Sequence, residues 1–229
     1  MDPRSSAGTP TVLLAGATGL VGRALLIRLL AAERRQRVIV VARKPLPATS
    51  ARDPRLTVRV GDMATLAGES GTIDDAYIAL GTTIKVAGSE AAFRAVDFDL
   101  VVAVARRARA AGARRLAVVS ALGADSSSRV FYNRVKGDMQ AAVAALGYAS
   151  VVIAQPSLLM GDRAALGQPV RNVEMLAAGL LRPLMGWIPR GVRPIAAADV
   201  AQAMLDATLA GKAGTSILGS GLMQAAARQ

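Results

Sequence analysis

The segment FYNRVKGDMQ, residues 131–140, places a tyrosine and a lysine four positions apart. If the segment is helical, Tyr132 and Lys136 lie on one face of the helix, where their side chains can interact. A phenol can donate a proton to a reacting oxygen, and a neighbouring ammonium stabilises the phenolate that remains. The pair is either a proton donor with its activating cation or a solvated pair on a helix surface. We favour the catalytic interpretation.

A serine upstream of this pair supports that interpretation. Ser120 lies near the end of RLAVVSA, residues 115–121, an apolar run typical of a buried strand. Its hydroxyl can orient a substrate carbonyl beside the Tyr132 hydroxyl and stabilise charge on the carbonyl oxygen. We therefore predict Ser120, Tyr132 and Lys136 as catalytic residues.

The chain contains no His and no Cys, which narrows the chemistry further. Hydrolases that depend on Ser-His-Asp or Cys-His arrangements are excluded, as are the usual zinc and iron ligand sets. Proton transfer must then use Tyr, Lys, Asp, Glu or water, and we expect no metal.

A glycine-rich turn predicts a dinucleotide site. GATGLVG, residues 16–22, follows the apolar run TVLLA and precedes a stretch whose apolar residues have helical spacing. Glycines let the backbone approach a pyrophosphate, and the helix N-terminus supplies free N–H groups. The alternative is a glycine turn without a ligand. The predicted contacts are Gly16, Ala17, Thr18, Gly19, Leu20, Val21 and Gly22.

The residues after the second strand indicate which dinucleotide binds. Proteins that prefer NAD usually carry an acidic residue about twenty residues past the glycines, where it binds the ribose 2′-OH. This chain has Arg43 and Lys44 there, in VVARKP. A guanidinium can bind a 2′-phosphate with two hydrogen bonds. We therefore predict NADP(H) rather than NAD(H); two ordinary surface cations are the alternative.

Two later turns, GDM at 61–63 and ALGTT at 79–83, end strands whose carboxyl ends would lie over the dinucleotide. Asp62 can approach the adenine, and the backbone near Gly81 can approach the ribose and phosphates. Ordinary turn chemistry is the alternative explanation. The predicted contacts are Asp62, Met63, Leu80, Gly81 and Thr82.

Apolar runs and helical segments alternate along the chain. We predict strands at 11–15, 37–43, 56–62, 75–80, 115–121 and 149–156, and helices at 22–35, 90–111, 131–146, about 170–181 and 196–211. This alternation predicts an α/β fold, a doubly wound parallel-sheet Rossmann fold in a single domain. We expect a disordered lead over residues 1–10 and one domain over 11–229, with a loop-rich cap at about 157–195.

Composition bears on location and partners. Apolar residues make up 52% of the chain, but none of their runs is long enough to span a membrane. The first ten residues carry no apolar signal segment, so we expect a cytoplasmic protein. The net charge of +12 and the Arg-rich stretch 105–115 could attract nucleic acid. A solvated helix side explains them better, because aromatic residues are only 3% of the chain. The final helix would permit a homodimer.

These motifs together resemble the short-chain dehydrogenase/reductase superfamily. The finer patterns ALGTT, VDFD, VSALGAD, FYNRVKGDMQ and QPSLLMGDR resemble an atypical branch of small reductases. The resemblance covers about residues 11–210. It implies NADPH binding, Ser120 and Tyr132 at the reacting carbonyl, Lys136 on the ribose, and Pro156 and Ser157 against the nicotinamide.

The chain departs from the superfamily pattern in one helix and in its length. Many members carry an Asn that supports a proton relay, where this chain offers Asp97 and Asp99. The chain is also too short for the larger substrate domain of nucleotide-sugar epimerases.

We therefore expect an NADPH-dependent reductase of a carbonyl or quinone-like small molecule, with Tyr132 as proton donor. The rival is an NADPH-binding sensor in which the cofactor orders the segment 180–194 and a protein partner detects the change. Arg182, Trp187, Arg190 and Arg193 either line a substrate pocket or decorate a cap.

Overall fold

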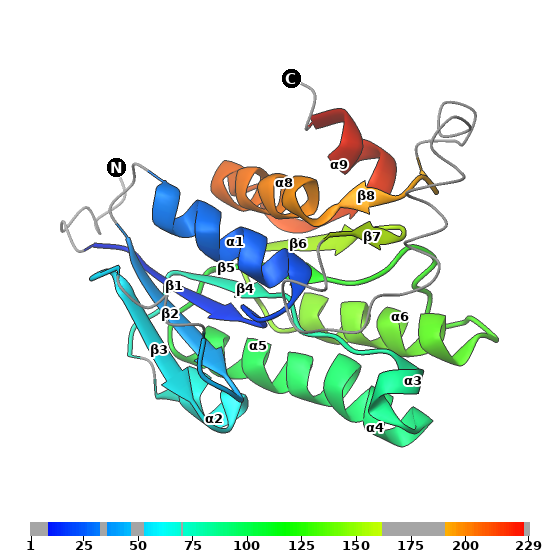
Figure 1. Cartoon of the computed structure of the whole chain (residues 1–229), viewed down its shortest axis with the longest axis horizontal. Coiled ribbons are helices and arrows are strands. Elements are labelled where there is room, and N and C mark those ends of the chain that lie inside the picture. The colour runs from blue at the N-terminus through cyan, green and yellow to red at the C-terminus, as the bar shows by residue number, and fades with distance from the viewer. Residues whose placement is uncertain (1–8, 33–35, 47–52, 70, 162–190, 227–229) are drawn as a thin grey trace.

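A computed structural model describes residues 9–32, 36–46, 53–69, 71–161 and 191–226 (Figure 1). Its main sheet has seven parallel strands in the order β3-β2-β1-β4-β5-β6-β9. They are β1 Thr11–Ala15, β2 Arg37–Ala42, β3 Leu56–Val60, β4 Asp75–Ile78, β5 Arg115–Val119, β6 Ser150–Gln155 and β9 Gly214–Gly219. The predicted Rossmann-type parallel sheet is confirmed, and its strand order reverses beside β1, where such sheets bind ligands.

Helices cover both faces of this sheet (Figure 1). Helices α1 Leu20–Ala31 and α8 Ala197–Ala210 pack together on one face, and α2 Met63–Gly68, α5 Val101–Ala110 and α6 Phe131–Ala144 lie on the other. Strand β1 shows why both faces need cover. Val12 and Leu14 enter the core beneath α1 and α8, and Leu13 and Ala15 enter the opposite core. A strand that is buried on both sides has a continuous apolar sequence, which is why TVLLA could be predicted as a strand.

Several elements were not predicted. The expected helix 90–111 consists of α4 Glu90–Arg94, a π-helix η2 Ala95–Leu100, and α5. Short helices α2 and α3 Ile84–Ala87 follow the turns at 61–63 and 79–83, and α9 Ser220–Ala226 follows β9. Two short strands, β7 Leu159–Met160 and β8 Ile195–Ala196, pair in parallel. The expected helix 170–181, most of the cap and the lead at 1–8 lie outside the described residues.

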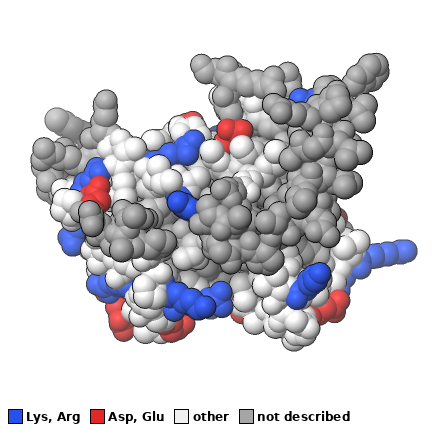
Figure 2. Space-filling view, in the orientation of Figure 1, with Lys and Arg blue, Asp and Glu red and all other residues white. Residues whose placement is uncertain are grey.

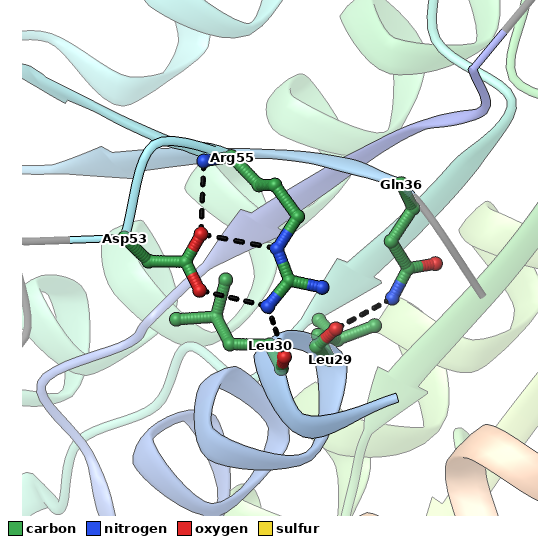
Figure 3. Close-up of polar contacts among 5 residues, drawn as sticks. All are labelled: Leu29, Leu30, Gln36, Asp53 and Arg55. Carbon is green, nitrogen blue, oxygen red and sulfur yellow. Dashed lines mark hydrogen bonds and ion pairs between the residues drawn. The ribbon is translucent and has the colours of Figure 1, made fainter. Parts of the chain in front are cut away.

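Polar contacts at the amino end of the sheet fix the loop before β3 to the end of α1 (Figure 3). Arg55 binds Asp53 through both nitrogens of its fork, with Nε–Oδ1 3.0 Å and Nη2–Oδ2 2.7 Å. The same Nη2 donates to the Leu30 carbonyl, and Gln36 Nε2 donates to the Leu29 carbonyl at 2.8 Å. These donors satisfy carbonyls that the end of a helix leaves unpaired. The hydrogen bonds from Arg55 lower the pKa of Asp53.

The surface charge is dispersed over the visible face, where Lys and Arg occur in several separate places with Asp and Glu among them (Figure 2). On α5, Arg109 donates to the Gly147 carbonyl at 2.9 Å and lies over the Tyr148 ring, so this arginine fixes a loop.

Within the described ranges, no helix has the length and apolar character needed to cross a membrane, and no group of acidic side chains could hold a metal.

Candidate functional site

The glycine turn lies between β1 and α1, at the carboxyl edge of the sheet (Figure 1). Gly16 has a φ of +93°, and an ideal Cβ there would lie 2.4 Å from the Ala79 carbonyl oxygen. A Cβ on Gly22 would lie 2.0 Å from the Gly16 carbonyl oxygen. Only glycine therefore fits at these two positions, and the turn is as tight as the motif predicts.

The first turn of α1 can receive a pyrophosphate. Its N-cap is Gly19, which has no side chain to bond the first N–H groups. These N–H groups and the helix dipole favour an anion, so this turn fits a dinucleotide. The side chains of Ala17 and Val21 are buried in the core, so any contact from them with the cofactor is through the backbone. Leu20 lies against Gly161, at the start of the segment that follows β7.

The other predicted cofactor contacts lie at the ends of β2, β3 and β4. Arg43 and Lys44 directly follow β2 and are exposed. Asp62 caps α2, accepting hydrogen bonds from the Thr65 backbone N–H at 3.0 Å and from the Thr65 hydroxyl. These hydrogen bonds lower the pKa of Asp62. The side chains of Met63 and Leu80 are buried in the core.

Lys136 forms a buried ion pair with Asp97. Its ammonium nitrogen lies 2.7 Å from Asp97 Oδ1, and the two side chains are only 4% and 1% exposed. The second carboxylate oxygen, Oδ2, accepts a hydrogen bond from the Thr82 backbone N–H at 2.8 Å. A buried charge is costly unless it is paired and hydrogen-bonded, and Asp97 is both. Asp97 thus links the predicted cation of α6 to the turn after β4.

A π-helix carries both acidic residues, and Asp97 is the one that faces inward. Asp97 lies within η2 and is fully buried, whereas Asp99 is exposed. A π-helix is a rare insertion that shifts the faces of the surrounding helix, and such insertions are frequent at functional sites. The carboxylate of Asp97 occupies the neighbourhood where the superfamily pattern led us to look for an Asn.

Ser120 follows β5 and takes part in a chain of side-chain hydrogen bonds. Its hydroxyl oxygen accepts from Gln140 Nε2 at 2.6 Å, and Gln140 Oε1 accepts from Gln155 Nε2 at 3.1 Å. Gln140 lies on α6 four residues after Lys136, and Gln155 ends β6. Sequence reasoning missed both glutamines. The only available signal was the repeated spacing of four in Tyr132, Lys136 and Gln140.

Tyr132 is the partly exposed member of the three tyrosines. Tyr77 and Tyr148 are buried at 1% and 8% exposure, and the Tyr148 hydroxyl donates to the Ala105 carbonyl at 2.6 Å. Burial also raises the pKa of Tyr148. The Tyr132 ring packs on buried Phe93, with ring centres 5.2 Å apart. Phe93 therefore holds the phenol in place while the ring keeps access to solvent. Phe93 was also missed.

A glycine beside Lys136 brings the segment after β5 onto α6. An ideal Cβ on Gly137 would lie 2.1 Å from the Ser126 backbone nitrogen. The Asp125 backbone N–H donates to the Asn133 carbonyl at 3.0 Å, which holds the same segment. The loop that begins at Ser120 can therefore pack directly on the helix that carries Tyr132.

The segment after β6 is tied to the last part of the chain. The Ser157 hydroxyl donates to the Arg193 carbonyl at 2.5 Å and shares a hydrogen bond with the Ser220 hydroxyl at 2.9 Å. The Pro156 carbonyl accepts from the Leu122 N–H at 2.9 Å, which joins the ends of β5 and β6. Arg182, Trp187 and Arg190 lie outside the described residues.

Comparison with known proteins identifies the family. Residues 16–159 match the model of a family described as NAD(P)H-binding, and this stretch includes the glycine turn, Ser120, Tyr132 and Lys136. The chain belongs to the NAD(P)H-binding family. The prediction that the chain binds a nicotinamide dinucleotide is thereby confirmed at the level of NAD(P)H.

Relatives and solved structures agree with this membership. The fmp52 protein of Aspergillus niger is 34% identical over 188 residues, which cover 80% of this chain and 78% of that protein. An oxidoreductase of the short-chain dehydrogenase/reductase family from Burkholderia thailandensis has a TM-score of 0.67 at 18% identity, covering 95% of this chain and 94% of that one. The Bordetella bronchiseptica enzyme WbmG, solved in complex with NAD, has a TM-score of 0.68 at 16% identity, covering 96% of this chain and 75% of that enzyme. At this level of identity the solved structures show that the chain shares the fold of a short-chain dehydrogenase/reductase.

The expectation of a cytoplasmic protein is contradicted by the relatives. FMP52 proteins of four fungi, 30% to 36% identical to this chain, are all named mitochondrial. The expectation relied on the missing apolar signal segment. That criterion detects secretory signals only, because mitochondrial transit peptides are amphipathic and rich in Arg and Ser.

Proposed function

We propose that this member of the NAD(P)H-binding family is an NADPH-dependent reductase of the short-chain dehydrogenase/reductase type. Its substrate would be a carbonyl or quinone-like small molecule. One observation carries the proposal: a single face of α6 presents Tyr132 and Lys136 and also contacts Ser120 through Gln140. A phenol, a cation and an oriented hydroxyl beside a dinucleotide site are the groups that carbonyl reduction requires.

In the proposed mechanism, the hydride that adds to the carbonyl carbon would come from NADPH when it is bound, leaving NADP⁺. Tyr132 donates its hydroxyl proton to the carbonyl oxygen, which becomes the alcohol oxygen of the product. Ser120 donates a hydrogen bond to the same oxygen and stabilises its developing negative charge. Lys136 stabilises the Tyr132 phenolate and binds the nicotinamide ribose, while Asp97 holds the ammonium in place. The phenolate regains a proton from water before the next turnover.

The preference for NADPH over NADH rests on Arg43 and Lys44. Both are exposed directly after β2, next to the strand that leads into the glycine turn. The pair offers positive charge for a 2′-phosphate, and a guanidinium can bind it with two hydrogen bonds. In the same proposal Asp62 approaches the adenine, and Pro156 and Ser157 contact the nicotinamide.

A second candidate function, an NADPH sensor, is favoured by the contacts of Ser157. Its hydroxyl joins the end of β6 to the Arg193 carbonyl and to Ser220 at the start of α9. Cofactor binding beside Pro156 would therefore change the positions of segments distant in the sequence, and a protein partner could detect that change.

The two functions are separated by incubating the wild-type protein with NADPH and a panel of aldehydes, ketones and quinones. The reductase proposal expects NADPH consumption that depends on the acceptor, with one reduced product formed per NADPH. NADPH binding without consumption across the panel would contradict it. A protein partner retained only in the presence of NADPH would then support the sensor.

A further inference from the structure

Gln140 extends the helix face that carries Tyr132 and Lys136. It follows Lys136 by four residues, so the three side chains lie along one side of α6. The residue is 9% exposed, and its amide nitrogen donates to the Ser120 hydroxyl oxygen at 2.6 Å. The helix that bears the proposed proton donor therefore also contacts the serine that follows β5.

A second hydrogen bond sets the orientation of the Gln140 amide. Gln155 Nε2 donates to Gln140 Oε1 at 3.1 Å. With its oxygen bound to Gln155, Gln140 presents its N–H donors to Ser120. A hydroxyl has one hydrogen to donate and two lone pairs that accept. Ser120 accepts from Gln140, so its own hydrogen is directed to a different acceptor.

We infer that Gln140 is a positioning residue that makes the Ser120 hydroxyl a hydrogen-bond donor to the substrate oxygen. The inference rests on the proposed reductase function, in which Ser120 stabilises charge on that oxygen. A donor aimed at developing charge contributes a factor of about 10²–10³ to turnover. Gln155 supports this arrangement by holding Gln140 in the required orientation.

The test replaces the donor with an acceptor of the same size. In Gln140→Glu the ionised carboxylate accepts the Ser120 hydrogen and withdraws it from the substrate, so we expect kcat to fall about 10- to 100-fold at the alkaline end of the pH range, where the carboxyl is ionised. As the pH falls, the carboxyl takes up a proton and can again donate to Ser120, and burial favours this neutral form. The ratio of wild-type to variant kcat should therefore approach one at lower pH.

Two further variants serve as controls for the pH dependence of kcat in Gln140→Glu. Gln140→Met removes the donor without adding a charge, and we expect a loss whose ratio to wild type stays constant with pH. Gln202→Glu makes the same chemical change at an exposed position on α8, and we expect wild-type kcat at every pH. A Gln140→Glu ratio that is constant with pH, or equal to one throughout, overturns the inference.

A second readout needs no turnover. The side-chain amide resonance of Gln140, assigned by its loss in Gln140→Met, should shift in Ser120→Ala because its hydrogen-bond acceptor is removed. An unchanged resonance overturns the inference. Absence of acceptor-dependent turnover by the wild type would defeat the proposed function and this inference with it. Wild-type turnover with an unaffected Gln140→Glu defeats the inference alone.

Discussion

Two ion pairs at opposite ends of the sheet show how the same kind of contact can serve different purposes. At the amino end, Arg115 of β5 binds Asp75 of β4 through both arms of its fork, with Nε–Oδ1 2.5 Å and Nη2–Oδ2 2.6 Å. At the carboxyl end, Lys136 binds Asp97 through a single oxygen at 2.7 Å. Both aspartates are buried. The two pairs differ in where each cation lies relative to the glycine turn, which is at the carboxyl end of the sheet.

The amino-end pair is complete in itself. A bidentate pair satisfies the geometry of both groups, and the hydrogen bonds that Arg115 donates to Asp75 raise the pKa of Arg115. It joins two neighbouring strands at their first residues. The Lys136 ammonium also keeps N–H donors beyond the one that faces Asp97, but it lies at the carboxyl end of the sheet, the same end as the glycine turn. We therefore propose a structural role for the amino-end pair and a chemical role for the carboxyl-end pair.

The largest expected effect comes from Lys136→Met. This variant removes the cation and leaves Asp97 buried without its partner. We expect turnover to fall about 10²- to 10⁴-fold and the free energy of unfolding to fall by about 3 kcal/mol. Initial rates and urea unfolding measure the two losses separately.

The double variant Lys136→Met with Asp97→Asn separates chemistry from stability. It removes the unpaired carboxylate, so we expect most of the free energy of unfolding to return while turnover stays low. A double variant that regained turnover would contradict a chemical role for Lys136.

A smaller effect, confined to stability, is expected for Asp75→Asn. The Arg115 side chain is 24% exposed and can regain water, so we expect a loss of about 2 kcal/mol in the free energy of unfolding. NADPH affinity and turnover of the folded protein should be unchanged, because the pair lies at the far end of the strands. Urea unfolding and an NADPH titration check this. A weakened NADPH affinity would contradict a purely structural role for the Asp75–Arg115 pair.

The smallest effect is expected for Arg43→Ser, which removes one exposed cation. We expect NADPH affinity to fall about tenfold, the equivalent of one charge-assisted hydrogen bond, and NADH affinity to stay the same. Calorimetric titration of both cofactors measures this. Arg106→Ser, an equal change of charge on the exposed side of α5, serves as control. Equal losses for the two cofactors would contradict the assignment of Arg43.

The sheet was predictable from the sequence because buried parallel strands leave continuous apolar runs. Strand β9 escaped prediction because its residues GTSILG offer only a short apolar stretch, and its identity depends on pairing with β6. The glycine turn and the Tyr132–Lys136 spacing were visible because each belongs to a single local element.

The rest of the candidate site depends on tertiary contacts. Asp97 and Asp99 are two residues apart, and Asp97 is the buried one, where its carboxylate pairs with Lys136 of α6. The partner of Gln140 is Ser120, which follows β5 and lies twenty residues earlier, and the contact of Ser157 with Ser220 joins segments still further apart. No local sequence pattern predicts which residues form such pairs.

The most direct test of the central claim is acceptor-dependent NADPH oxidation by Tyr132→Phe, measured beside wild type at saturating NADPH. Tyr148→Phe is the matched control, since Tyr148 is buried and donates to the Ala105 carbonyl. The account predicts that Tyr132→Phe binds NADPH normally and turns over about 10²- to 10⁴-fold more slowly, while folded Tyr148→Phe keeps the wild-type rate. Wild-type turnover by Tyr132→Phe would contradict it.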